Sequence, residues 1–489
     1  MTPEEFRAAG HRLVDWIADF RTHLPDLPVG ATVRPGEVAA GMPPAAPRTA
    51  ASIEELLVEL DRLVVPGTTH VQHPRYAGWF PANASLASVL GDLASTGIGA
   101  LGLSWQSAPA LTEVEEVVCA WLATETGLPP GWRGSIHDTA STACLVALLA
   151  ARERASTAGG AGGGGLQAEA APLVVYTTEQ AHSSVAKAAR LAGFGADNLR
   201  LVPTDSAHAM DVAALAAAMD GDAAAGRRPA AVVASVGSTG VTAIDPVAAI
   251  TQAAAGHGAW VHVDAAMAGS GLLLPELRHL LDGDADGVLR ALDAADSLSW
   301  NPHKWMGTAL DCSLLYLRDP SAVAVVMSTD PSYLRSGADG QVTQFRDWGI
   351  PLGRRFRALK LWFHLHLDGL DAIRARLRRD LANAAWLAEQ VAATPGWRVL
   401  APVRLQTVCV RHEPPGLVGA DGRVLDGGTL DLHTQAWAAA VNASGAAFVT
   451  PALLDGHWMV RVSVGAETME REDLAAVWAA MREAAQRRP

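Results

Sequence analysis

Short apolar runs that alternate with helical stretches between about residues 110 and 320 constrain the fold of this chain most. Several of these runs are continuous rather than alternating, which is typical of strands covered on both faces in a mostly parallel sheet. In chain order the runs are LVVYTT (173–178), LRLVP (199–203), AAVVASVG (230–237), AWVHVDAA (259–266), ADSLSW (295–300) and SLLYLRD (313–319). They predict an α/β fold with helices on both faces of the sheet.

The flanking regions have different patterns. Helical spacing of apolar residues marks residues 1–65, and such an arm has too little core to be stable alone. Mixed α/β patterns follow a long helical stretch after residue 350. The sequence therefore predicts a helical arm at 1–85 that packs on a partner subunit, a large domain at 86–350 and a small C-terminal α/β domain at 351–489.

Composition and charge exclude several functional classes. The net charge is −13 with no basic cluster, which argues against nucleic acid or an anionic membrane as a partner. No apolar run is long enough to cross a bilayer, and the start of the chain lacks the pattern of a signal peptide, so we expect a cytoplasmic protein. The four cysteines form no CxxC pair, so we expect neither structural zinc nor a disulfide framework.

Lysine is rare in this chain, which narrows the search for an amine nucleophile. Only Lys187, Lys304 and Lys360 are lysines among 38 basic residues. A desolvated lysine amine can form an imine with an aldehyde, whereas a guanidinium cannot. Lys187 and Lys360 lie in amphipathic helical settings, where a lysine at the surface or its rim is the default. Lys304 instead follows an apolar strand in SLSWNPHKWMG, and parallel sheets place their sites at this end of a strand.

Three further features precede Lys304, and each has an alternative reading. Asp264 ends an apolar run and could hold the proton of a pyridinium nitrogen, or it could simply cap a helix. The stretch 138–155 opens a helix with hydroxyls and small residues, which suits a phosphate but equally suits capping. His182 follows another strand and could stack on a ring, or be an ordinary polar residue. Their order along the chain is that of one constellation.

The chain resembles the group II pyridoxal-phosphate decarboxylases, and among them the aromatic L-amino-acid decarboxylases and related aldehyde synthases. The matching stretches are HPRYAGWFPANASLAS, GIGALGLSWQSAPALTEVEEVV, AHSSVAKAA, HVDAAMAGS, NPHKWMG and RDWGIPLGRRFRALKLWF, between about residues 70 and 365. The resemblance implies the aspartate-aminotransferase fold (fold type I), pyridoxal 5'-phosphate as cofactor, and a homodimer with sites at the subunit interface.

The resemblance also implies roles for individual residues. Lys304 would form the internal aldimine, Asp264 would pair with the pyridine nitrogen, and decarboxylation would pass through a quinonoid. The other implied cofactor contacts are His182 stacked on the ring, Ala266 on its opposite face, His303 beside Lys304, Thr239 near the pyridine hydroxyl, and Thr139, Ala140, Ser141 and Asn301 at the phosphate.

The segment 328–350 corresponds to a loop that, in the resembling enzymes, carries a tyrosine thought to protonate Cα. At that position this chain has Phe345, which has no proton to give. Tyr333 matches a separate family position. In relatives with phenylalanine here, O2 intercepts the reaction and yields an aldehyde, ammonia and peroxide. We therefore expect aldehyde formation, with amine formation by a plain decarboxylase as the alternative.

The substrate is expected to be an aromatic L-amino acid of the tryptophan or phenylalanine type. By resemblance, the side-chain pocket is lined by Trp79, Phe80, Pro81, Ala82, Leu101 and Leu103. Such a pocket favours a flat apolar ring, since no arginine is evident to pair with a carboxylate side chain. Two other classes compete: another pyridoxal-phosphate reaction, such as transamination, and a cofactor-binding scaffold without activity. A nicotinamide-binding protein is excluded because no GxGxxG motif lies between a predicted strand and a helix.

Overall fold

The structure is a computed structural model that describes residues 1–157, 163–284, 286–329, 337–419 and 424–487. Contacts divide the chain into two compact units, each assembled from separate stretches of sequence. One unit comprises Ala82–Ala384 and Ala401–Thr407, and the other comprises Met1–Pro81, Ala385–Leu400 and Val408–Pro489. The predicted division into an arm, a large domain and a small domain stays a prediction.

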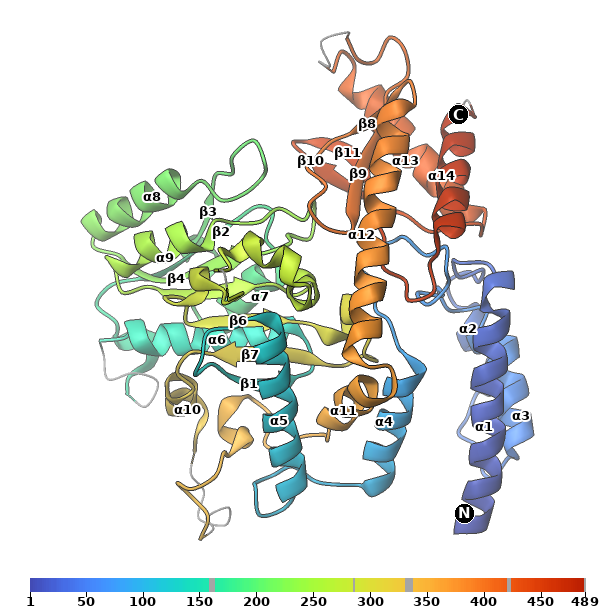
Figure 1. Cartoon of the computed structure of the whole chain (residues 1–489), viewed down its shortest axis with the longest axis horizontal. Coiled ribbons are helices and arrows are strands. Elements are labelled where there is room, and N and C mark those ends of the chain that lie inside the picture. The colour runs from blue at the N-terminus through green and yellow to red at the C-terminus, as the bar shows by residue number, and fades with distance from the viewer. Residues whose placement is uncertain (158–162, 285, 330–336, 420–423, 488–489) are drawn as a thin grey trace. The chain divides into compact units, whose positions relative to one another are not determined.

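A seven-stranded sheet forms the centre of the first unit (Figure 1). The strand order is β1-β7-β6-β5-β4-β2-β3. Neighbours from β6 through β5, β4 and β2 to β3 are parallel, whereas β7 is antiparallel to both β6 and β1. The strands are β1 (Arg133–His137), β2 (Leu173–Thr178), β3 (Leu199–Val202), β4 (Arg228–Ser235), β5 (Trp260–Asp264), β6 (Ser297–Trp300) and β7 (Ser313–Leu317).

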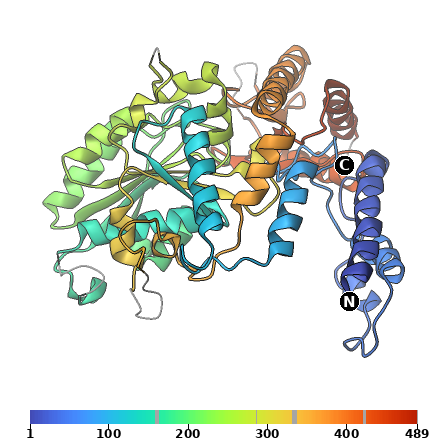
Figure 2. The ribbon, with the colours of Figure 1, turned by 60° about the horizontal axis from the view of Figure 1, so that its bottom comes forward.

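Helices cover both faces of this sheet, as Figures 1 and 2 show. On one face α6 crosses the strands and packs against α7 and α10, while α8 and α9 pack together over β4. The helices of this unit are α4 (Leu86–Ile98), α5 (Pro109–Thr126), α6 (Ala140–Ala155), α7 (Ser183–Leu191), α8 (Val212–Ala224), α9 (Val247–Ala255), α10 (Ser321–Met327) and α11 (Ala358–Leu367). The predicted α/β fold with a mostly parallel sheet is therefore confirmed.

Each apolar run from the sequence forms one of the strands β2 to β7. Except for β3, these strands are buried along most of their length, and five residues of β5 are buried in a row. No such signal marks β1, because RGSIH contains a single large apolar residue. β1 is nonetheless important, since it leads directly into α6 and its N-terminus.

The second unit contains a four-stranded sheet and the helices at both ends of the sequence. The strand order of this sheet is β10-β11-β9-β8. Its elements are α1 (Pro3–His23), α2 (Glu37–Gly41), α3 (Ile53–Glu59), β8 (Trp397–Val399), β9 (Thr407–His412), α13 (Gly427–Ala443), β10 (Thr450–Leu454), β11 (His457–Ser463) and α14 (Arg471–Gln486). α12 (Leu370–Ala393) runs from one unit into the other, and Gly369, with φ +79°, separates it from α11.

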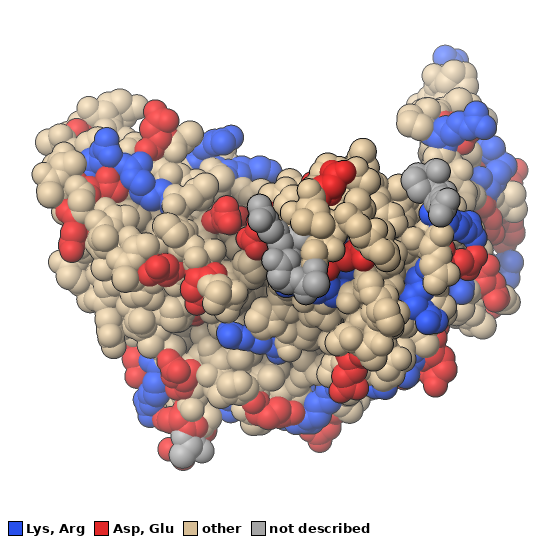
Figure 3. All heavy atoms as spheres, turned by 90° about the horizontal axis from the view of Figure 1, so that it is seen from above, with Lys and Arg blue, Asp and Glu red and all other residues tan. Residues whose placement is uncertain are grey.

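The described helices include none that is both long enough and apolar enough to cross a membrane. On the face seen in Figure 3, Lys and Arg side chains are interspersed with Asp and Glu.

Candidate active site

The predicted site residues of the first unit follow strands that end at one edge of the sheet. Because β2, β4, β5 and β6 are parallel, their carboxyl ends share this edge. His182, Thr239 and Lys304 follow β2, β4 and β6, and Asp264 is the last residue of β5. β1 also ends here, because two antiparallel pairings through β7 make it run in the direction of β6. The N-terminus of α6 is therefore delivered to the same edge.

Lys304 lies in a short helical segment, Pro302–Met306, that begins directly after β6. Its backbone angles, φ −96° and ψ −112°, are not helical. An unusual backbone conformation persists only where its surroundings determine it, and such conformations cluster at functional sites. Here the Lys304 N–H donates to the carbonyl of Asn301 (2.9 Å), and Asn301 in turn donates its N–H to Ala266 (3.0 Å).

Side chains from distant elements hold the carbonyls around Lys304. Asn83 Nδ2 donates to the Lys304 carbonyl at 3.2 Å. Arg376 Nη2 donates to the carbonyls of Trp305 and Met306, both at 2.6 Å. Neither Asn83 nor Arg376 was assigned a role from the sequence, because each lies more than 70 positions from Lys304.

Asp264 is the last residue of β5 and is buried. Its register partners are Ser235 in β4 and Ser299 in β6. Oδ1 accepts the N–H of Ala266 at 3.0 Å, which fixes the orientation of the carboxylate. Burial, reinforced by the negative charge of Asp264, raises the pKa of the Cys144 thiol in α6. The carboxylate is therefore held on the face of the sheet that α6 covers.

His182 caps the N-terminus of α7 and also lies within reach of the other site charges. Its Nδ1 accepts the N–H of Ser184 (3.2 Å), so the neutral ring carries its proton on Nε2. Burial and the positive charge of Lys304 lower the pKa of His182, while Asp264 opposes this shift. The capping role and the predicted role at the ring are compatible, because capping uses Nδ1 and does not involve Nε2–H.

The N-terminus of α6 suits a phosphate. Thr139 is the N-cap, and its hydroxyl accepts the N–H of Thr142 at 3.4 Å. The first N–H groups of an α-helix have no acceptor within the helix, and its dipole favours an anion there. Ala140 and Ser141 are the first residues of this helix. Asn301 Oδ1 is buried without a hydrogen-bond partner in the described structure, as expected of a side chain whose partner is a bound group.

These observations fit pyridoxal phosphate. An amine, a carboxylate, an imidazole and an anion-binding helix N-terminus belong to one edge of the sheet, as a cofactor with an aldehyde, a pyridine ring and a phosphate requires. Ala266 and Thr239 are both partly buried in the turns that follow β5 and β4. Their predicted contacts with the ring and its hydroxyl stay predictions.

The side chains of His303 and Lys360 are both buried, although polar side chains usually lie at the surface. His303 is buried, and the Cys312 N–H donates to its Nδ1 at 2.9 Å. The expectation of a surface or rim position for Lys360 was wrong: this side chain is 0% exposed and pairs with Asp92 at 3.0 Å. The partner lies in α4, far away in sequence, so the helical pattern around Lys360 did not reveal the burial. Lys187 is exposed, as expected.

Phe345 lies in the interior of its own unit. Its ring is 4% exposed and belongs to a cluster of buried apolar residues that includes strands β2 and β4 and helix α6. Trp348 packs edge-on against it at 5.2 Å, and the Arg354 guanidinium lies 4.8 Å from its centroid. The predicted role of Phe345 at the reacting atoms stays a prediction, and Tyr333 lies outside the described residues.

The six residues of the predicted substrate pocket fall in different units. Trp79, Phe80 and Pro81 belong to the second unit, where the Arg461 guanidinium lies 4.8 Å from the Phe80 ring and Trp79 is exposed. Ala82, Leu101 and Leu103 belong to the first, where Leu101 is exposed. Their assignment to one pocket stays a prediction.

Buried histidines predict that the protein loses stability in mild acid. Burial lowers the pKa of His262 and His303 to about 4 and that of His137 and His364 to about 3. As the pH falls below about 6.5, these histidines therefore bind protons in the unfolded chain but stay neutral in the folded chain. Each histidine then costs up to about 1.4 kcal/mol of unfolding free energy per pH unit as the pH falls from 6.5 toward 4. Burial raises the pKa of Asp245 to about 6 and also raises that of Asp380, and these two carboxyl groups oppose the loss.

We expect the urea midpoint to fall clearly between pH 7.5 and pH 5.5, a range in which ordinary carboxylates stay ionised. A midpoint that does not change over this range contradicts the neutral, buried state of these histidines.

Comparison with known proteins places the chain in a family. The model of the pyridoxal-dependent decarboxylase conserved domain matches residues 35–413. Tryptophan decarboxylase 2 of Oryza sativa subsp. japonica is 36% identical over 99% of this chain and 95% of its own length. Phenylacetaldehyde synthase of Arabidopsis thaliana is 35% identical over 99% of this chain and 96% of its own.

Solved structures agree with this placement. The crystal structure of Oryza sativa TDC with PLP and tryptamine has a TM-score of 0.92 and 34% identity, covering 99% of this chain and 98% of that one. Rhodiola rosea 4-hydroxyphenylacetaldehyde synthase has a TM-score of 0.89 and 29% identity, covering 99% of both chains. The chain therefore belongs to the pyridoxal-dependent decarboxylases, uses pyridoxal phosphate, and falls among relatives that include both aromatic amino-acid decarboxylases and aromatic aldehyde synthases.

Proposed function

We propose that this enzyme removes CO2 from an aromatic L-amino acid and releases the corresponding arylalkylamine. The choice of an amine over an aldehyde as the product rests on the burial of Phe345. A ring packed among core residues serves to fill space, so the absence of a hydroxyl there says little about a proton at Cα. Aldehyde formation was expected because Phe345 has no proton to donate. Since Phe345 is packed among core residues, its lack of a hydroxyl no longer argues for the aldehyde.

The tyrosines of the chain narrow the choice of the group that donates the proton to Cα. Tyr76, Tyr176 and Tyr316 are buried, and burial raises the pKa of each hydroxyl above its usual value. Tyr176 donates to Asp222 and Tyr316 donates to the Cys119 carbonyl, both at 2.8 Å. Tyr333 is the fourth tyrosine of the chain. Its hydroxyl and the Nε2–H of His182 are therefore the groups to test as the source of the proton.

The residues at the sheet edge divide the work. Pyridoxal phosphate supplies the electron sink that accepts the electron pair of the Cα–carboxylate bond. Lys304 provides the amine that holds the cofactor covalently, and Asp264 holds a proton at the pyridine nitrogen. The α6 N-terminus, with Thr139, Ala140, Ser141 and Asn301, binds the phosphate, and His182 covers the ring. The substrate loses CO2, takes up one proton at Cα and leaves as the amine.

A paired substitution tests the product assignment. Phe345→Tyr places a hydroxyl in the core, so we expect a less stable enzyme, by about 1–3 kcal/mol, with unchanged products. Tyr333→Phe removes the remaining candidate hydroxyl of the 328–350 segment, so we expect aldehyde and peroxide to rise at the expense of amine.

Amine, aldehyde and peroxide are quantified together for both variants and for His182→Gln. A wild type that forms aldehyde, and a Phe345→Tyr variant that shifts toward amine, overturn the assignment and restore the role expected of Phe345 from the sequence.

The homodimer is part of the proposal. Leu86, Leu90 and Leu93 follow one another at helical spacing on α4, and all three are exposed. An exposed apolar stripe of this kind is typical of a helix that a second subunit covers. Sedimentation velocity measures this directly, and a monomer at micromolar concentration contradicts it. Location in the cytoplasm stays a prediction.

A further inference from the structure

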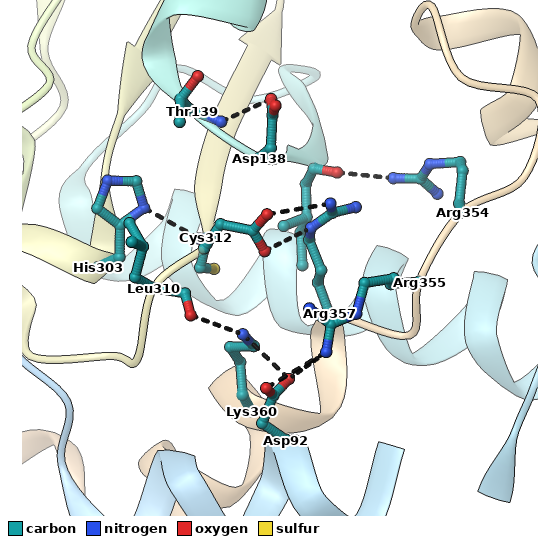
Figure 4. A network of polar contacts seen from close by, with 12 residues as sticks. Asp92, Asp138, Thr139, His303, Leu310, Cys312, Arg354, Arg355, Arg357 and Lys360 are labelled. Carbon is teal, nitrogen blue, oxygen red and sulfur yellow. Dashed lines mark hydrogen bonds and ion pairs between the residues drawn. The ribbon is translucent and has the colours of Figure 1, made fainter. Parts of the chain in front are cut away.

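The chain segment 307–312 follows Lys304 and is held from the side of α11 at several successive residues. Thr308 Oγ1 and His364 Nδ1 lie 2.9 Å apart. Lys360 Nζ donates to the Leu310 carbonyl at 3.5 Å. Arg357, the N-cap residue of α11, binds Asp311 with two nitrogens: Nε to Oδ1 at 2.9 Å and Nη2 to Oδ2 at 3.2 Å (Figure 4).

The other side of this segment contacts His303. The backbone N–H of Cys312 donates to His303 Nδ1 at 2.9 Å. The backbone N–H of His303 donates to the Cys312 carbonyl at 3.3 Å. A backbone N–H can donate only to an unprotonated ring nitrogen, so the neutral ring carries its proton on Nε2. Burial, together with the charge of Lys304, lowers the pKa of His303 to about 4, so the ring is neutral at pH 7. His303 is the covalent neighbour of Lys304, and its placement bears directly on the lysine.

Asp311 and Cys312 are covalent neighbours, so the carboxylate and the N–H move together. The Asp311 carboxylate has more than one cation nearby. Burial alone would raise the pKa of Asp311, but the hydrogen bond and charge of Arg357, with the charges of Lys360 and Arg355, lower it. The bidentate contact with Arg357 fixes the direction of the carboxylate, since a planar guanidinium matches a carboxylate geometrically.

Arg357 also faces the phosphate helix. Burial works to lower the pKa of Arg357, but the hydrogen bond and charge of Asp311, with a smaller contribution from the charge of Asp138, raise it. Asp138 Oδ1 accepts the N–H of Thr139, the N-cap of α6, at 2.7 Å. Arg357 therefore interacts electrostatically with the turn that opens the phosphate-binding helix as well as with the segment that holds His303.

We propose that Arg357 is a positioning residue of the active site, which acts through Asp311 to hold the Cys312 N–H on His303 and so sets the ring and the adjacent Lys304 for the cofactor. Arg357 acts through its two hydrogen bonds to Asp311. Its neighbour Arg355 offers a matched control, because its side chain is exposed and pairs with Asp92 of α4.

A double-mutant cycle tests the proposal. The variants are Arg357→Gln, the isosteric Asp311→Asn, and the two combined, with Arg355→Gln as control. We measure kcat, KM and the dissociation constant of pyridoxal phosphate, together with the visible absorbance of the bound cofactor. Misplacement of a reacting group by about 1 Å costs up to a hundredfold in rate. We therefore expect each single variant to lower kcat by about tenfold to a hundredfold and to weaken cofactor binding, with KM changing less.

The combined variant is expected to be no worse than either single one, because both remove the same contact. Arg357→Lys, which keeps the charge but not the fork, is expected to recover only part of the loss. Losses that multiply in the double variant overturn the proposal, as does an equal loss in Arg355→Gln. Asp311→Asn keeps the side-chain volume, so it yields a folded protein for the test even if Arg357→Gln does not. All variants are compared by cofactor binding, so the outcome is independent of whether amine or aldehyde is formed.

Discussion

Replacement of Lys304 by alanine is expected to abolish covalent cofactor binding and to lower kcat by on the order of a thousandfold or more. The reason is that no other described lysine can substitute for it. Lys187 is exposed on α7, and Lys360 is fully buried in an ion pair with Asp92. After borohydride reduction, mass spectrometry of digested wild-type protein locates the cofactor on the peptide that contains Lys304.

Two variants provide the controls for Lys304. Lys187→Ala is expected to keep the visible absorbance and the activity of the wild type. Lys304→Arg keeps the positive charge but is expected to fail like alanine, since a guanidinium cannot form the imine. Reduced cofactor found on Lys187 or Lys360, or an active Lys304→Ala enzyme, contradicts the assignment.

The second large effect is expected from Asp264→Asn, which should lower kcat by about a hundredfold to a thousandfold while leaving the fold intact. The amide oxygen can still accept the Ala266 N–H that orients Asp264. What the variant loses is the negative charge that holds a proton at the pyridine nitrogen, and with it the electron sink.

Asp245→Asn serves as the matched control for this effect. Asp245 is also buried, and it accepts the N–H groups of Ser235 and Met210, both at 2.7 Å. We expect that variant to lose stability and to keep kcat within about threefold, because the group supports structure and not chemistry. An Asp264→Asn enzyme with wild-type kcat and an unchanged cofactor spectrum contradicts the role given to this carboxylate.

The sheet and the location of the site were accessible from the sequence for a definite physical reason. Strands buried on both faces must be continuously apolar, so β2 to β7 stand out, and parallel strands place the residues that follow them at one edge. The sequence alone therefore suffices to group His182, Asp264 and Lys304. β1 was not predicted, because its sequence, RGSIH, lacks an apolar run.

The residues that hold the site in place could not be predicted from the sequence, because their contacts join distant parts of the chain. Asn83 and Lys304 are 221 positions apart, and Arg357 and Asp311 are 46 apart. No local pattern records such pairs. Phe345 shows the same limit in another form: its residue type invites an argument about a missing hydroxyl, whereas its burial against α6 and Trp348 is a property of the folded chain.

The family placement removes the two competing classes considered from the sequence. The match to the pyridoxal-dependent decarboxylase domain spans most of the chain, including every implied cofactor-binding position. The relatives differ in product, since they include tryptophan decarboxylase and phenylacetaldehyde synthase at nearly equal identity. Overall similarity therefore does not choose between the two reactions, and the choice rests on individual side chains.

The most direct test is to incubate the purified enzyme, loaded with pyridoxal phosphate, with L-tryptophan, L-phenylalanine, L-tyrosine and L-DOPA in air. CO2, amine, aldehyde and peroxide are quantified in the same samples. The account predicts one amine for each CO2 with at least one of these substrates, and no peroxide above background. Aldehyde and peroxide in amounts that match CO2 would contradict the proposed product, and no CO2 from any of the four would contradict the aromatic assignment itself.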